Sequence, residues 1–440
     1  MSGRNKRGRD AMGVGLAALN RLASAGAIDK LRLRKPVERA VYEGAKAGFR
    51  SVGAANRTFA KVQGRGKAER PGKAGGRDLF DLTPTEEQQM IVGATREFSA
   101  EQIRPVAADA NESCETPAEL LKRSVSELGV TIVGVPESLG GMGSERSATT
   151  SALVAEALAH GDMGIAVACL APAGVSSALT LWGDDAQQAT YLPSFVGDDV
   201  PAAALAIVEP RPLFDAFQLK TKASRTPSGY VLDGVKSLVP RAASAELFIV
   251  AAALDGKATL FIVESSTKGI SVESEPAMGL RAASTGRLIL ESVTVPLSAK
   301  LGDADDYTEC VRLSRIAWSA LACGTGQAVL DYVIPYVNER QAFGEPISHR
   351  QAVAFMVANI AIELEGARLT MLRAASRAEQ GQPYAREAAL ARKLSSDYGM
   401  QIGSSGVQLL GGHGYVKEHP VERWYRDLRA VGVMEGVVLV

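Results

Sequence analysis

A carboxylate and a glycine-rich turn near the carboxyl end are the residues whose types and spacing could do chemistry. The stretch Gln408-Leu-Leu-Gly-Gly-His-Gly-Tyr415 directly follows a long helical pattern. Glycines without a Cβ let a backbone turn sharply or approach a ligand closely. Glu435 stands between Val433-Met434 and Val437-Val438-Leu439. Apolar surroundings raise the pKa of a carboxylate towards neutrality, so the pattern predicts a usable base, with an exposed terminal glutamate as the alternative.

The order of these motifs resembles the flavin-dependent acyl-CoA dehydrogenase family over residues 78–436. The shared pattern is Gln-x-x-Gly-Gly-x-Gly-Tyr, then Arg426-Asp427, then Glu435-Gly436. The resemblance implies that Glu435 takes the α-proton of an acyl-CoA while N5 of FAD accepts the β-hydride, which yields a trans-2-enoyl-CoA. Some members carry the base at the position of Ser314, but a serine cannot take an α-proton.

The same resemblance implies a set of binding residues. Arg315 and Gly436 would lie on the substrate side. The contacts to the adenine and pyrophosphate groups of FAD would come from Arg340, Phe343, Gln351 beside Arg350, Gln408, Gly411 and Gly412. Arginine suits this role because its guanidinium meets phosphate oxygens in two places. Solvated turn residues and ordinary core packing are the alternatives for these positions.

Five apolar residues depart from the family pattern around the flavin ring, namely Val208, Phe214, Leu238, Pro240 and Val437. Proline offers neither a hydroxyl nor a backbone N–H at its position. Two interpretations follow: an enzyme that holds FAD mainly by its nucleotide half, or a non-catalytic homologue that serves as a binding or assembly subunit. Retention of Glu435 favours the enzyme. An acyl-CoA oxidase would use the same base.

Cysteine, histidine and apolar patterns exclude several other classes. The four cysteines contain no Cys-x-x-Cys pair and the four histidines show no ligand spacing, so no metal site or disulfide framework is predicted. No apolar run of eighteen residues lacks polar interruption, which disfavours a membrane-spanning helix. Nucleic-acid binding is disfavoured because aromatic interleaving and recognition motifs are absent.

The elements that must position these residues change in period along the chain. The helical domain at 78–200 has a helix start at Thr83-Pro-Thr-Glu86-Glu87, and helical patterns then run to about Leu192. Short alternating stretches in 201–305, of which Phe217–Ala223 is the first, predict a small antiparallel β-domain. Helical patterns return in 306–440 and suggest a four-helix bundle. The fold class is therefore α+β, in the α-β-α domain order of acyl-CoA dehydrogenases.

Residues 1–77 form a basic extension and linker with 19 Lys and Arg against 5 Asp and Glu, whereas the remaining 363 residues carry 30 against 44. An anionic membrane surface, an acidic protein partner or an organelle transit peptide would each suit this segment, and a mobile tail is the alternative. We expect the cytoplasm, with peripheral membrane contact, or the mitochondrial matrix if a transit peptide is present. The resemblance further implies fatty acid metabolism, an electron-transfer flavoprotein as acceptor, and a homodimer or homotetramer, with a hetero-oligomer as the alternative.

Overall fold

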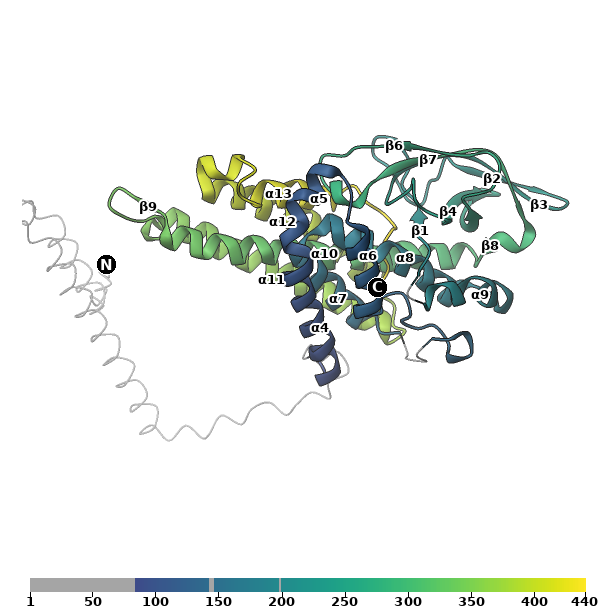
Figure 1. Ribbon diagram of the computed structural model, residues 1–440, viewed down its shortest axis with the longest axis horizontal. Coiled ribbons are helices and arrows are strands. Elements are labelled where there is room, and N and C mark those ends of the chain that lie inside the picture. The colour runs from purple at the N-terminus through teal and green to yellow at the C-terminus, as the bar shows by residue number, and fades with distance from the viewer. Residues whose placement is uncertain (1–83, 142–145, 198) are drawn as a thin grey trace, which may run out of the picture. The chain divides into compact units, whose positions relative to one another are not determined.

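The computed structural model describes residues 84–141, 146–197 and 199–440, and helices, strands and helices follow one another along these ranges (Figure 1). The predictions for residues 1–77 lie outside the described residues. The fold is of the mixed α+β class that the sequence predicts, with a small sheet between two helical regions.

The first helical region begins at the predicted start, with Thr85 as the N-cap of α4. Its hydroxyl accepts from the Gln88 N–H, and the Gln88 side chain accepts from the Thr85 N–H, which is a capping box. The helices are α4 (Glu86–Phe98), α5 (Ala107–Ser113), α6 (Ala118–Leu128), α7 (Ala148–Gly161), α8 (Met163–Trp182) and α9 (Asp185–Tyr191).

Helix α8 is long and apolar enough to cross a membrane, which the sequence prediction did not anticipate. Within the protein, however, 83% of its apolar window is buried. Asp162 caps the helix by accepting from the Ile165 N–H. A helix that is apolar all round can be the central helix of a folded core, and α8 lies in that position.

The sheet of the middle region has the order β6-β7-β3-β2-β4-β5-β8, with β1 beside β4. Most pairings are antiparallel, as predicted, but β1 and β2 both pair with β4 in parallel. The strands are β1 (Ala203–Ala206), β2 (Lys222–Thr226), β3 (Gly229–Val239), β4 (Leu247–Leu254), β5 (Lys257–Glu264), β6 (Ile270–Ser274), β7 (Gly286–Pro296) and β8 (Lys300–Leu301).

One predicted strand begins later than the sequence suggested. Residues 217–221 of the expected strand Phe217–Ala223 precede β2, because the Asp215 carboxylate accepts from the Phe217 N–H and holds a local turn. Strand β1 was missed. All four of its residues are buried, so it lacks the alternation by which a half-exposed strand is recognised.

The last region contains three long helices, α10 (Ala304–Glu339), α11 (Gln351–Glu379) and α12 (Ala385–Leu410), and the shorter α13 (Val421–Ala430). Figure 1 shows α10, α11 and α12 running beside one another, and α12 also packs on α13. A small hairpin of β9 (Gln341–Ala342) and β10 (Glu345–Pro346) separates α10 from α11. This arrangement is the predicted helical bundle.

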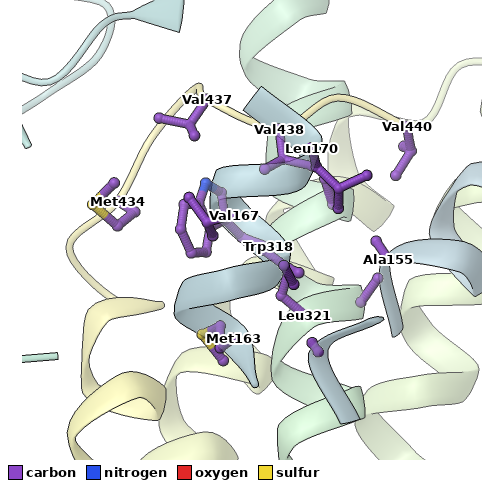
Figure 2. Close-up of a cluster of buried hydrophobic side chains, with 14 of the residues drawn as sticks. Ala155, Met163, Val167, Leu170, Trp318, Leu321, Met434, Val437, Val438 and Val440 are labelled. Carbon is purple, nitrogen blue, oxygen red and sulfur yellow. The ribbon is translucent and has the colours of Figure 1, made fainter. Parts of the chain in front are cut away.

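A large apolar core joins the two helical regions with one face of the sheet, and a second, smaller apolar cluster lies within the sheet region. Trp318 of α10 and Met163 of α8 are among the fully buried side chains of the large core. Residues 437–440 also belong to this core, and Figure 2 shows Val437, Val438 and Val440 among the side chains of α7, α8 and α10. The stretch that carries Glu435 therefore enters the protein interior.

Candidate active site

Glu435 lies on the loop that leaves α13 and enters the core, and it is 7% exposed. Its neighbours Met434 and Val437 are buried as well, at 1% and 2%. The sequence indicated these apolar surroundings. The structure adds two guanidinium groups beside the carboxylate, so desolvation alone does not describe its electrostatic environment.

Arg315 of α10 holds the Glu435 carboxylate through both oxygens. The Arg315 Nε donates to Oε1 and Oε2 at 3.1 Å each, and Nη2 donates to Oε1 at 2.8 Å. The Arg315 guanidinium also lies over the Phe217 ring, whose centroid is 5.5 Å from Cζ. The residue expected on the substrate side thus contacts the expected base directly and fixes its orientation.

Arg392 of α12 is a second cation at this carboxylate, and the sequence did not single it out. Its Nη2 is 3.8 Å from Glu435 Oε1, and its guanidinium donates to the carbonyl oxygens of Val431 and Met434. Burial lowers the pKa of Arg392, while Glu435 raises it. Arg392 therefore holds the loop on which Glu435 is carried and supplies positive charge beside it.

Helix α10 also holds Gly436, the residue after the base. The Gly436 carbonyl oxygen accepts from the Ser314 hydroxyl and from the Trp318 Nε1–H, at 2.8 Å each. Gly436 has a φ of +73°, and a Cβ at this position would lie 2.6 Å from Ile207 Cδ1. A side chain would therefore be strained here, both by backbone conformation and by contact.

The backbone N–H of Glu435 has no hydrogen-bond acceptor among the described residues. A buried N–H group without a partner is uncommon in folded proteins. Beside a buried carboxylate, such a donor can bind the carbonyl oxygen of a ligand. The arrangement therefore combines a proton acceptor with a group that can polarise a carbonyl.

A hollow of ≈ 940 Å³ lies between the β9–β10 hairpin and the end of α12. Phe343 stands at the hairpin turn with a φ of +55° and is 96% exposed. The following Gly344 also has a positive φ, of +82°, as a type I′ turn requires. An exposed aromatic ring in a conformation that non-glycine residues rarely adopt suggests a binding role.

Polar donors line the same hollow. The side chains of Arg340 and Gln408 are exposed and have no hydrogen-bond or ion-pair partner among the described residues. A Cβ on Gly411 or Gly412 would meet no atom within 4 Å, so the backbone faces open space there. A free guanidinium, a free amide and open backbone beside an aromatic ring suit the adenosine diphosphate half of FAD.

Tyr336 and His413 also line the hollow, although neither was among the predicted site residues. The Tyr336 hydroxyl is 2.8 Å from His413 Nδ1, and the His413 ring stacks on His419 with centroids 5.1 Å apart. His413 lies within the glycine motif, where contact with a ligand was the less favoured interpretation. Gln351, which was expected here, is an exposed residue at the start of α11; its neighbour Arg350 lines the hollow, and the Arg350 Cζ is 5.6 Å from the Phe343 ring centroid.

A buried ion pair joins two segments that were expected beside the flavin ring, the loop after β1 and strand β3. Lys236 of β3 is fully buried, and its Nζ donates to Glu209 Oε1 at 3.1 Å and to the Ile207 carbonyl oxygen at 3.2 Å. Glu209 also accepts from the N–H groups of Lys220 and Thr221. Burial lowers the pKa of Lys236 to about 8, and Glu209 opposes that shift. This pair holds the loop after β1 against strand β3.

The apolar replacements lie on or next to these segments. Val208 and Pro240 are buried, whereas Phe214 and Leu238 are partly exposed. The Phe214 ring lies against Arg211, with the guanidinium carbon 5.4 Å from its centroid. None of the four side chains can donate or accept a hydrogen bond, so ring contacts here would come from apolar surface and from the backbone.

Comparison with known proteins finds three family models in succession. The N-terminal domain of acyl-CoA dehydrogenase matches residues 85–199, the middle domain matches 204–293, and the C-terminal domain matches 306–438. The chain is similar to the mitochondrial short/branched chain specific acyl-CoA dehydrogenase of Rattus norvegicus. The two are 33% identical over 365 residues, which cover 80% of this chain and 83% of the relative.

Solved structures show the same similarity. Butyryl-CoA dehydrogenase from Megasphaera elsdenii superposes with a TM-score of 0.74 and 28% identity, covering 81% of this chain and 96% of that one. The structure of PigA with FAD and proline superposes with the same TM-score and 25% identity, again covering 81% and 96%. Both similarities cover the two helical regions and the sheet between them.

Proposed function

The chain belongs to the acyl-CoA dehydrogenase family, and on that premise we propose that it oxidises an acyl-CoA thioester with Glu435 as the base. The reaction removes a proton from the α-carbon and a hydride from the β-carbon and leaves a trans-2-enoyl-CoA. Glu435 takes the proton. Bound FAD supplies the acceptor for the hydride. The observation that carries the proposal is the buried Glu435 carboxylate, held in one orientation by Arg315.

The ion pair prepares the carboxylate for a substrate. Contacts to both oxygens fix the plane of the carboxylate, so little reorganisation is needed when a substrate arrives.

The unpartnered Glu435 N–H completes the site. An α-proton is too weakly acidic for a carboxylate unless the adjoining carbonyl oxygen is polarised by a donor. We infer that the Glu435 N–H donates to the thioester oxygen, where negative charge develops as the proton leaves. Ser314 and Trp318 support this role from one residue further on, because they bind the Gly436 carbonyl oxygen and so hold the Gly436–Val437 peptide.

The nucleotide half of FAD would be held at the hollow beside the β9–β10 hairpin. We assign phosphate contacts to Arg340 and Arg350, stacking to Phe343, and polar or close backbone contacts to Gln408, Gly411 and Gly412. Gln351 remains a proposed contact at the start of α11. The proposal for FAD is supported by the similarity to PigA, whose solved structure contains FAD.

Other parts of the proposal rest on the family alone. An electron-transfer flavoprotein is the proposed acceptor, and fatty acid metabolism and a homo-oligomer are the proposed setting. The domain boundaries at 77, 200 and 305, and the cytoplasmic or peripheral membrane location, stay predictions. The reading as a non-catalytic assembly subunit is not favoured, because the relative from Rattus norvegicus is an acyl-CoA dehydrogenase and a carboxylate is retained at Glu435.

The absorption spectrum of the purified protein tests the proposal. We expect a flavin spectrum that is bleached by an acyl-CoA. Glu435→Gln should keep the flavin and slow bleaching by roughly 10²–10⁴-fold, the usual contribution of a general base. Glu418→Gln, at an exposed position, is the matched control. A colourless protein that stays empty with added FAD would support the assembly subunit instead, and undiminished bleaching in Glu435→Gln would remove Glu435 from the mechanism.

A further inference from the structure

The residues that follow Glu435-Gly436 fill apolar space next to the proposed base. Val437, Val438, Leu439 and Val440 are 2%, 1%, 8% and 0% exposed. We refer to these four residues as the 437–440 segment. Its surroundings come from α7, α8 and α10, and Figure 2 shows them as Ala155, Val167, Leu170, Trp318 and Leu321.

The backbone of this segment is held in one path. The Val438 N–H donates to the Gly436 carbonyl oxygen at 3.0 Å, which closes a tight turn around Val437 with a φ of +79°. A β-branched residue rarely adopts this conformation, so the packing around it must hold it. On α8, a Cβ on Gly174 would lie 2.5 Å from the Val437 carbonyl oxygen. The glycine therefore makes room for the segment.

A cavity of ≈ 440 Å³ adjoins the segment and is lined by Val438 and Leu439. We call it the distal cavity. Its other apolar lining comes from α4, α7 and α8, including Ile91, Val154, Leu170 and Ala173. Thr85, Gln88 and Ser147 also line it and supply polar groups. An apolar cavity with a few polar groups is the usual form of a small-molecule site.

Chain connectivity places this cavity close to the base. Val438 is three residues from Glu435, so the two Cα atoms lie within about 11 Å of each other. An acyl group whose α-carbon lies at the Glu435 carboxylate needs apolar surface for the rest of its chain. After the base, the first apolar residues along the chain are those of the 437–440 segment, and they pack against α8 and α10.

We propose that the 437–440 segment determines acyl-chain specificity, because it limits the depth available beyond Glu435 and separates the base from the distal cavity. The protein as it stands therefore prefers short acyl groups. Shortening the Val438 side chain joins the distal cavity to the site and admits longer chains. This inference rests on the proposed dehydrogenase function, since it assumes that the α-carbon is placed at Glu435.

Chain-length profiles of the full-length protein with FAD test the inference. Butyryl-, octanoyl- and palmitoyl-CoA would be compared by kcat/KM and, independently of turnover, by calorimetric binding. In the wild type we expect at least tenfold tighter binding and higher kcat/KM for butyryl-CoA than for palmitoyl-CoA. Val438→Ala should raise the palmitoyl-to-butyryl ratio at least tenfold, whereas the control Val433→Ala, at a residue 46% exposed, should leave the ratio unchanged.

A second variant tests the role of the distal cavity. Ala173→Leu in the Val438→Ala background fills the cavity from α8 and should restore the short-chain preference.

The inference is overturned if the wild type binds and turns over palmitoyl-CoA as well as butyryl-CoA, a result that does not depend on the folding of any variant. It is also overturned if Val438→Ala folds and keeps the wild-type ratio. Failure of every acyl-CoA to bleach the flavin would instead refute the proposed function, and the calorimetric series would still report the depth of the site.

Discussion

Arg315 binds both carboxylate oxygens of Glu435 within 3.1 Å, although the two residues lie 120 positions apart in the sequence. The geometry needs a planar group with two donors on one edge, which only arginine provides among the cationic side chains. The same pair brings α10 and the loop after α13 together at the base. Orientation of Glu435 should therefore depend on arginine itself and not on positive charge alone.

Arg315→Lys should lower kcat/KM by about tenfold or more while the protein remains folded, because a lysine ammonium cannot hold both oxygens in one plane. Steady-state kinetics with a short acyl-CoA measure this effect. Arg312→Lys is the control, since Arg312 lies on the same helix and its ion pair, with Glu309, is long at 3.8 Å. Equal activity in Arg315→Lys and the wild type would show that the two-oxygen contact is unimportant for turnover.

Arg340→Gln should weaken FAD binding by about tenfold or more, because it removes a charge from the hollow beside Phe343. The dissociation constant is measured by titrating the apoprotein with FAD and following flavin fluorescence. Arg225→Gln, an exposed position on β2, should leave the constant unchanged. If both variants bind FAD as the wild type does, the diphosphate contact assigned to Arg340 is wrong.

Asp427→Asn should alter how stability depends on pH. Burial and the neighbouring Asp162 raise the pKa of Asp427 to about 7, although Arg423, Arg426 and the Leu280 N–H oppose the shift. In unfolded protein the carboxyl group loses its proton near pH 4. Between these values the native state holds a proton that the unfolded state lacks, so the contribution of Asp427 to stability falls as pH rises from about 4 to about 7.

An asparagine has no proton to lose and can still accept from Leu280. The free energy of unfolding of Asp427→Asn, relative to the wild type, should therefore rise over that interval, by at most about 4 kcal/mol, and stay level above it. Denaturant unfolding at several pH values measures the difference, with the exposed Asp109→Asn as control. A difference that is constant from pH 4 to 8 would contradict the assignment.

Gly436→Ala should lower the free energy of unfolding by about 2 kcal/mol, because the position has a positive φ and a Cβ would press on Ile207. It should also reduce turnover, since the same residue follows the base. Gly366→Ala on α11, where a Cβ meets nothing within 4 Å, is the control for stability. Thermal unfolding of the two variants provides the comparison, and equal stability would exclude the predicted contact.

Local patterns predicted much of the fold and of the site. The helix start at Thr85, the return of helical period after the sheet, and the motif around Glu435 are each encoded within a few consecutive residues. Contacts between residues far apart in the sequence could not be predicted from such local patterns. In the sequence, Arg392 does not differ from other polar residues of a helix. Its contact with the loop at Met434 follows only from the packing of α12. Strand β1 was hidden because both of its faces are buried.

The ion pair at Glu435 also shows that sequence motifs do not predict contacts between residues far apart in the sequence. Each partner could be chosen from its motif, Arg315 for substrate and Glu435 for catalysis. Their contact follows only from the packing of α10 against the loop after α13. The apolar flank of Glu435 in sequence correctly indicated burial, whereas the charge that faces it came from residues more than 40 positions away.

Within two turns of α10, Ser314 and Trp318 donate hydrogen bonds to the Gly436 carbonyl oxygen, and Arg315 donates to the Glu435 carboxylate. Because these contacts join α10 to the loop that carries Glu435, the two segments should not accumulate substitutions independently. Among relatives that keep a glutamate and glycine at 435–436, substitutions at 314 and 318 should retain a hydrogen-bond donor. Relatives that lack the glutamate should show no such restriction at positions 314, 315 and 318.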